Sequence, residues 1–112
     1  MAIDPDLFRN TLLERRAELE REQAQAAVDR APVELDQESV GRLSRMDAMQ
    51  VQAMALAQER RRQTELSAIE AALARIEEGE FGYCIKCGEE IAKARLAHMP
   101  AVATCIGCAR GD

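Results

Sequence analysis

Apolar side chains recur at helical spacing along two long stretches of this chain. In residues 5–30 they stand four or seven positions apart, at Phe8, Leu12, Leu19 and Ala26. The second stretch holds two seams with steps of three, four and three: Met46, Met49, Ala53 and Leu56, then Leu66, Ile69, Leu73 and Ile76. Apolar residues at these intervals occupy one stripe of an α-helix. The pattern therefore predicts two amphipathic helices.

The ends of both helices carry sequence signals. Asp4-Pro5 is a typical start, because Asp caps free amides and Pro fits the first helical position. The residue before Pro32 avoids the helical region, so the first helix should end near residue 30. The pattern at 44–47 resembles a capping box and predicts the start of the second helix there, with Asp36 as the alternative cap. Gly79 predicts the end of that helix near residue 78, which leaves 31–46 as the connection.

An antiparallel arrangement of the two helices brings matching positions together. The expected neighbours are Ile3 with Leu73 and Ile76, Phe8 and Leu12 with Leu66 and Ile69, Leu19 with Leu56, and Ala26 with Met49. The polar centres also meet, which places Arg15 and Arg16 near Glu59 and Glu65. These positions predict a mainly α fold in which residues 1–79 form an antiparallel helical hairpin, packed like a coiled coil. Packing against a second copy in a bundle is the alternative, and we expect a monomer.

Composition and charge narrow the classes of function. The chain has 112 residues, a net charge of -5 and only 3% aromatic residues. It therefore cannot build a large hydrophobic core, and we expect an additional stabilising element such as a structural metal site. No segment of the chain is strongly basic, and residues 80–112 carry four basic and four acidic side chains. Sequence-specific DNA binding is therefore disfavoured, because phosphate contacts need clustered Lys and Arg. No apolar run approaches the roughly 20 residues of a membrane span and no signal peptide is evident, so we expect a cytoplasmic protein.

All four cysteines lie in the last quarter of the chain, as two Cys-x-x-Cys pairs separated by 17 residues. They are Cys84, Cys87, Cys105 and Cys108. This spacing is a strong zinc signature. Four thiolates leave no open coordination position, so residues 80–112 should form a small zinc finger around one structural Zn²⁺. A redox dithiol is the alternative, but it would need a strand–helix setting that the pattern does not show.

The remaining residues give little support to an enzyme. The pattern offers no open metal position, no Cys–His pair outside the finger and no phosphate-binding glycine loop. His98 is the only histidine, and four cysteines already complete the metal site, so we expect His98 on the surface or in packing.

The segment "EEGEFGYCIKCGEEIAKARLAHMPAVATCIGC" resembles the four-cysteine zinc finger of the DksA/TraR family. Shared features are the Phe-Gly-Tyr-Cys entry, the Cys-Gly-x-x-Ile run, the Ala-Arg-Leu segment, the proline before the second pair and the cysteine spacing. The resemblance implies a bacterial transcription regulator that binds RNA polymerase. In this family a helical hairpin enters the secondary channel of the polymerase, and acidic tip residues lie near the catalytic centre, often in concert with ppGpp.

The resemblance implies that acidic residues at the hairpin tip act on the polymerase. The family pattern Asp-x-x-Asp-x-Ala is absent from this chain. The acidic residues of the connection and the following helix start are Glu34, Asp36, Glu38 and Asp47, of which Asp36 and Asp47 are preferred. The alternative is that these acids only cap the helix and carry solvated charge.

The resemblance also implies contacts to ppGpp and to the rim of the polymerase channel, which fall on Arg61, Arg62 and Arg110. Ala68 and Ala109 stand where the family has basic residues. The alternative for the arginines is a solvated helix face.

A second hypothesis is a zinc-stapled helical interaction module unrelated to polymerase. Its binding face would be the adaptable side chains of Met46, Met49 and Met54.

Overall fold

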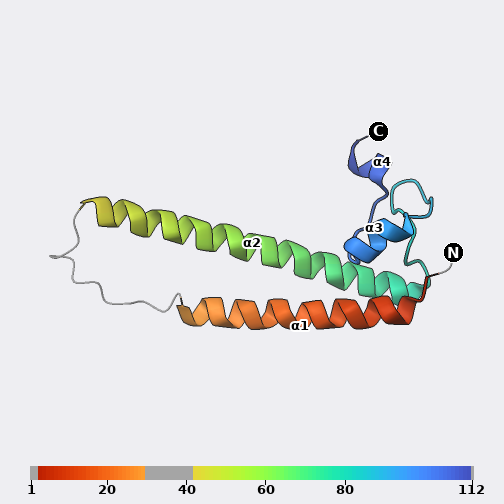
Figure 1. Ribbon diagram of the computed structural model, residues 1–112, viewed down its shortest axis with the longest axis horizontal. Coiled ribbons are helices and arrows are strands. Elements are labelled where there is room, and N and C mark those ends of the chain that lie inside the picture. The colour runs from red at the N-terminus through yellow and green to blue at the C-terminus, as the bar shows by residue number, and fades with distance from the viewer. Residues whose placement is uncertain (1–2, 30–41, 112) are drawn as a thin grey trace.

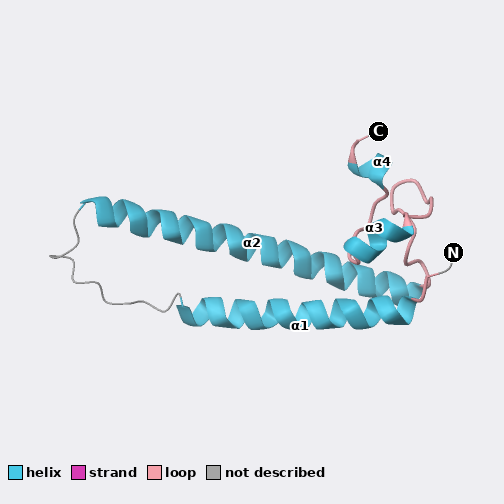
Figure 2. Cartoon of the chain, viewed as in Figure 1, coloured by secondary structure: helices cyan, strands magenta, loops and turns pink. Residues whose placement is uncertain are grey.

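The computed structural model describes residues 3–29 and 42–111 of the protein. The described residues form four helices, α1 (Pro5–Asp29), α2 (Arg42–Glu78), α3 (Lys93–His98) and α4 (Ile106–Ala109). The first two lie antiparallel, and the short helices with their loops form a small unit at one end (Figures 1 and 2). In this part of the chain extended pairing is limited to one antiparallel bridge between Tyr83 and Glu90. The predicted hairpin with a small C-terminal finger is thus confirmed.

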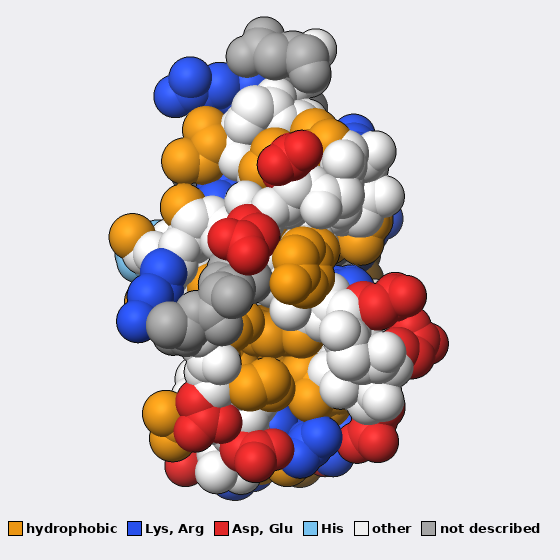
Figure 3. All heavy atoms as spheres, turned by 90° about the vertical axis from the view of Figure 1, so that its right-hand side faces the viewer, with side chains coloured by type: hydrophobic (Ala, Val, Ile, Leu, Met, Phe, Trp, Pro, Cys, Tyr) orange, Lys and Arg blue, Asp and Glu red, His pale blue; other side chains and the backbone are white. Residues whose placement is uncertain are grey.

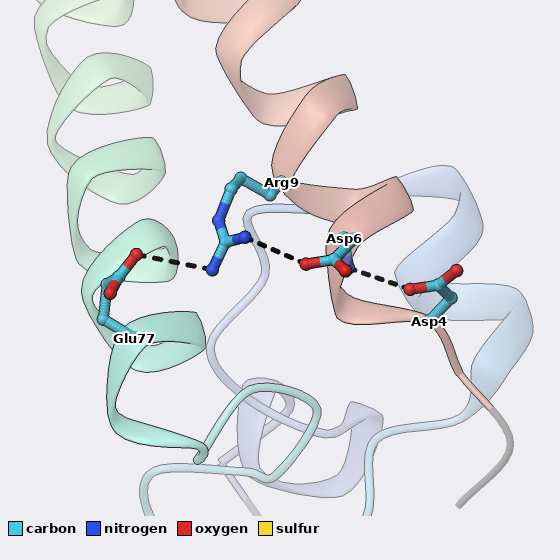
Figure 4. A network of polar contacts seen from close by, with 4 residues as sticks. All are labelled: Asp4, Asp6, Arg9 and Glu77. Atoms are coloured by element: carbon cyan, nitrogen blue, oxygen red, sulfur yellow. Dashed lines mark hydrogen bonds and ion pairs between the residues drawn. The ribbon is translucent and has the colours of Figure 1, made fainter.

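The start of α1 is fixed to the end of α2 by a chain of polar contacts (Figure 4). The carboxylate of Asp4 accepts a hydrogen bond from the backbone N–H of Asp6 at 3.0 Å, as expected of a helix cap. Arg9 donates to Asp6 at 2.9 Å and to Glu77 of α2 at 3.3 Å. The first turn of α1 is therefore held beside the last turn of α2, where the chain enters the finger.

Ion pairs farther along the hairpin fix its register. Arg15 donates through two nitrogens to Glu65, at 2.7 and 3.1 Å, which confirms one predicted pair. The prediction for Arg16 is wrong, because this side chain pairs with Glu70 at 3.0 Å. Arg15 and Arg16 are adjacent on α1, so their side chains diverge and meet acids on different turns of α2.

The buried core occupies the half of the hairpin that adjoins the finger. Leu12 and Leu19 of α1 pack there with Ile69 and Ile76 of α2. Ile3, Phe8, Leu66 and Leu73 are partly buried against this cluster, as the sequence predicts. No helix in the described part of the chain is long and apolar enough to cross a membrane.

The predicted packing of the distal half is wrong. Leu56 is 44% exposed and Met49 is 69% exposed, although they were expected to face Leu19 and Ala26. Figure 1 shows that α1 and α2 lie close together beside the finger and farther apart at the other end, where α2 continues past the end of α1. The two seams of α2 have the same spacing, so periodicity alone did not indicate which one α1 covers.

One hydrophobic core joins the hairpin to the finger. The rings of Phe8 and Phe81 lie 5.2 Å apart between centroids, within the range of favourable aromatic contacts. Phe81, Cys84, Ile91 and Leu96 of the finger are buried in the same cluster as the hairpin residues. The finger is therefore packed onto the base of the hairpin and fixes the direction in which α2 leaves it.

Candidate functional site

The first cysteine pair lies on a tight turn directly after the core residue Phe81. The backbone N–H of Gly88 donates to the carbonyl of Cys84 at 2.9 Å, which closes the turn around both sulfurs. Gly88 has φ of +77°, a conformation that favours glycine. The N–H of Cys84 donates to Glu89 at 2.8 Å, and that of Ile91 donates to Gly82 at 2.8 Å. These bonds make a short two-sided turn that aims both thiols in one direction.

The second pair is carried by the start of α4. Cys105 occupies the N-cap position, and its carbonyl accepts a hydrogen bond from Ala109 at 3.0 Å. Gly107 lies within this helix and is not among the glycines with positive φ, so the backbone freedom expected there is not used. Arg95 of α3 donates from Nε to the carbonyl of Thr104 at 2.9 Å and holds the segment in place. The N–H of Ile85 donates to Ala103 at 2.9 Å and joins the two arms.

The four sulfur atoms form one cluster in which all lie within 4.8 Å of one another. The sulfurs of Cys87 and Cys105 are 3.7 Å apart. A tetrahedral zinc site with Zn–S bonds of about 2.3 Å has sulfurs separated by about 3.8 Å, whereas a disulfide needs about 2.05 Å. The cluster therefore fits a tetrahedral thiolate site. Cys84 is buried and Cys87 is exposed, so one side of the site faces the core and the other faces solvent.

The protein environment affects the four thiols unequally. A hydrogen bond from the backbone N–H of Cys105 lowers the pKa of the Cys84 thiol from 9.0 to about 6. The neighbouring sulfurs of Cys105, Cys84 and Cys87 raise the pKa of Cys108 to about 12. Four adjacent negative charges are unfavourable without a cation, and a bound divalent metal allows all four sulfurs to be thiolates. The donor set is thus suited to a soft divalent ion with no further ligand.

The predicted tip residues are only partly within the described structure. Glu34, Asp36 and Glu38 lie outside the described residues. Asp47 is an exposed residue in the first turns of α2, at the end of the hairpin opposite the finger. Helix α2 begins at Arg42, a little before the start that the capping-box pattern predicts.

Two of the three predicted arginines line a hollow between the helices. Arg61 and Arg62 lie there opposite Arg15, above the buried side chain of Leu19, in a space of about 470 Å³. The Nε atom of Arg62 is buried and makes no hydrogen bond. Arg110 does not line this hollow and is exposed at the end of α4. Arg15 also lines this hollow and was not predicted as a site residue, although the two arginine-rich polar centres were expected to meet.

Two further hollows lie where the finger meets the hairpin, with volumes of about 340 and 560 Å³. Both are lined by Glu65, His98, Pro100 and Ala101. The larger one is otherwise lined by small or apolar residues, namely Ala68, Met99, Val102 and Ala103. His98 is exposed, as expected, and contributes to both hollows. Neither Lys nor Arg lines the larger hollow, so it does not suit a phosphate group.

Side chains of both charge signs are interspersed on the face that carries the finger (Figure 3). Lys86 and Lys93 are exposed there, but so are Glu80, Glu89 and Glu90. The described residues of this face therefore do not form the clustered basic patch that nucleic acid binding uses.

This architecture defines a class of protein: a long helical hairpin whose base is stapled by a closed four-cysteine metal site. The family model of the prokaryotic DksA/TraR C4-type zinc finger matches residues 79–112. Residues 79–112 therefore form a zinc finger of the DksA/TraR type, and its four cysteines hold a structural zinc ion.

One curated relative matches part of the chain. The RNA polymerase-binding transcription factor DksA of Haemophilus influenzae is 48% identical over 40 residues, which are 36% of this chain and 28% of that protein. The matched segments span less than a third of the curated relatives.

Two solved structures extend the likeness over nearly the full chain. Transcription factor DksA2 from Pseudomonas aeruginosa is 28% identical, with a TM-score of 0.72 covering 96% of this chain and 81% of that one. The DnaK suppressor protein from Agrobacterium tumefaciens C58 is also 28% identical, with a TM-score of 0.64 covering 100% and 96%.

Proposed function

We propose that this protein is a bacterial transcription regulator that binds RNA polymerase and inserts its hairpin into the secondary channel, where it modulates initiation. The supporting observation is the combination of a DksA/TraR finger with a hairpin that matches DksA2 along 96% of the chain. A relative that matches 36% of this chain is itself described as RNA polymerase-binding. The protein acts as a regulatory factor and not as an enzyme.

In this proposal the zinc ion has a structural task. The finger shares its core with the base of α1 and α2, so the closed thiolate site fixes the angle between finger and hairpin. A partner that contacts the finger and the hairpin together can bind both only if the angle between them is fixed. Zinc therefore acts on regulation through the direction of the hairpin, from the end opposite the start of α2 (Figure 1).

The acidic residues Asp36 and Asp47 act at the tip, with Glu34 and Glu38 as further candidates. Asp47 is exposed in the first turns of α2, and this end of the helix would enter the channel. A carboxylate near the catalytic metal ions of a polymerase changes the local potential and competes for cationic partners. Acid-to-amide substitution removes this charge while it preserves the size of the side chain.

A contact to ppGpp belongs to the same proposal, at Arg61 and Arg62. Their hollow carries three arginines, one of which already pairs with Glu65. Guanidinium groups bind phosphates through paired hydrogen bonds, and the buried Nε of Arg62 makes no hydrogen bond within the protein. Arg110 would contact the rim of the channel from the finger.

The test is an in vitro transcription assay with purified RNA polymerase, with and without ppGpp. The double variant Asp36→Asn/Asp47→Asn should retain binding to core enzyme and lose the regulatory effect. The matched control Glu14→Gln/Glu80→Gln removes two exposed acids elsewhere and should regulate like the wild type. Normal regulation by the tip double variant would show that the tip assignment is wrong.

A further inference from the structure

The distal part of α2 has a composition unlike the rest of the chain. Residues 48–58, "AMQVQAMALAQ", contain no charged side chain, although 31% of the protein is charged. We call this stretch the neutral segment. It lies in the half of α2 that diverges from α1 and then runs past its end (Figure 1). Charge is the usual means of solvating a helix surface, so its absence here requires a reason.

The neutral segment is exposed in the structure. Met49, Val51 and Met54 are 69%, 67% and 63% exposed, and Leu56 is also exposed. Long apolar side chains on a helix surface are stabilised when a partner removes them from water, at roughly 25 cal/mol for each Å² that is buried. Methionine is flexible and polarisable, so it adapts to a surface that is not part of its own fold. These properties indicate a binding surface.

The apolar side chains do not lie on one stripe. With about 100° per residue, Met49 and Leu56 point to one side of the helix, while Met54 and Val51 point to the other. The spaces between them hold only Ala and Gln. A helix that pairs with one flat partner needs a single apolar stripe, whereas a helix without charge on any side is suited to being surrounded.

The distribution of apolar side chains around the helix distinguishes between two possible binding partners, a second copy of this chain and a channel in a larger protein. A second copy packed against the neutral segment would cover one stripe and leave the opposite methionine in water. A channel in a larger protein contacts the helix on several sides at once.

We propose that the neutral segment is the part of the hairpin that the wall of the RNA polymerase channel encloses, and that apolar contact there supplies binding affinity. This inference rests on the proposed function and assigns separate tasks along α2. Asp47, just before the segment, carries the regulatory charge, and the methionines anchor the helix. Binding through this segment depends little on salt, because its side chains are uncharged.

The test measures affinity for core RNA polymerase by fluorescence anisotropy, using the zinc-loaded full chain. Met54→Glu, Met54→Lys, Met49→Glu and Met49→Lys place either charge on either side of the helix. Glu and Lys have helix propensities close to that of Met, so the hairpin keeps its circular dichroism spectrum. Leu7→Glu and Leu7→Lys are matched controls, because Leu7 is 64% exposed on α1 beside the finger.

The proposal expects all four methionine variants to bind at least about tenfold more weakly, with either charge, while both Leu7 variants bind like the wild type. If the wild type binds polymerase and these variants bind equally well, the inference is overturned and the proposed function stands. If only the variants on one side of the helix bind more weakly, or only those that carry one sign of charge, the inference that an apolar wall encloses the helix is overturned. If the wild type does not bind polymerase, the proposed function itself fails. Sedimentation that shows a dimer disrupted by the methionine variants makes a second copy the occupant and also overturns the inference.

Discussion

Substitution of Leu96 by Ala tests whether the finger and the hairpin share one core. Leu96 lies on α3 in the finger and is 0% exposed, in the cluster that includes Leu12 and Ile69 of the hairpin. Removing a fully buried leucine side chain typically costs about 3 kcal/mol, from lost transfer energy and the remaining cavity. A domain of this size has a total stability of roughly 5–15 kcal/mol. The variant should therefore lose a large fraction of it.

The assay is thermal unfolding of the zinc-loaded protein followed by circular dichroism at 222 nm. This signal comes mainly from α1 and α2, which contain most of the helical residues. A loss of about 3 kcal/mol should lower Tm by on the order of 10 °C. Leu96→Met nearly preserves the volume and should cost less than about 1.5 kcal/mol. Leu7→Ala, at an exposed position, should leave Tm almost unchanged. An unchanged helical transition in Leu96→Ala would refute the shared core.

Three other predictions concern the metal, the register and the hollow. Zinc content should fall as pH is lowered from 7 towards 5, since protons compete for the four sulfurs, and a zinc-binding dye should record the release together with a loss of cooperative unfolding. A double-mutant cycle with Arg15→Met and Glu65→Gln should give a coupling free energy between roughly 0.3 and 1 kcal/mol that declines in 1 M NaCl, because the pair is half-exposed; a coupling of zero at low salt would argue against the register. Arg61→Ala/Arg62→Ala should reduce the effect of ppGpp in transcription assays more than Arg110→Ala does, and equal effects would contradict the assignment of the hollow.

The metal site could be predicted from the sequence because its ligands carry their own spacing. Two residues between cysteines suffice for a turn that directs both sulfurs to one ion. In the structure the sulfur atoms of Cys87 and Cys105 lie 3.7 Å apart. The base of the hairpin could be predicted as well, because an antiparallel fold about the connection at 31–46 places Leu12 beside Ile69, and both are buried in one cluster. In both places local spacing determines which side chains meet.

The distal hairpin was not predictable in the same way. The seam through Met49 and Leu56 has the same periodicity as the seam through Ile69, but α1 covers only the second. The choice depends on where α1 ends and on the angle that the finger imposes, and neither is encoded in the spacing. The contribution of Arg15 to the hollow at Arg61 was not predicted, because it comes from the other helix.

The central claim is that the hairpin tip reaches the interior of RNA polymerase. A photo-crosslinking residue at position 47 of the zinc-loaded protein, bound to core enzyme, tests this most directly, with position 14 on α1 as the control. The account predicts crosslinks from position 47 to polymerase peptides around the catalytic centre, and none to those peptides from position 14. Crosslinks from position 47 to the outer surface of the enzyme, or no complex with core polymerase at all, would contradict it.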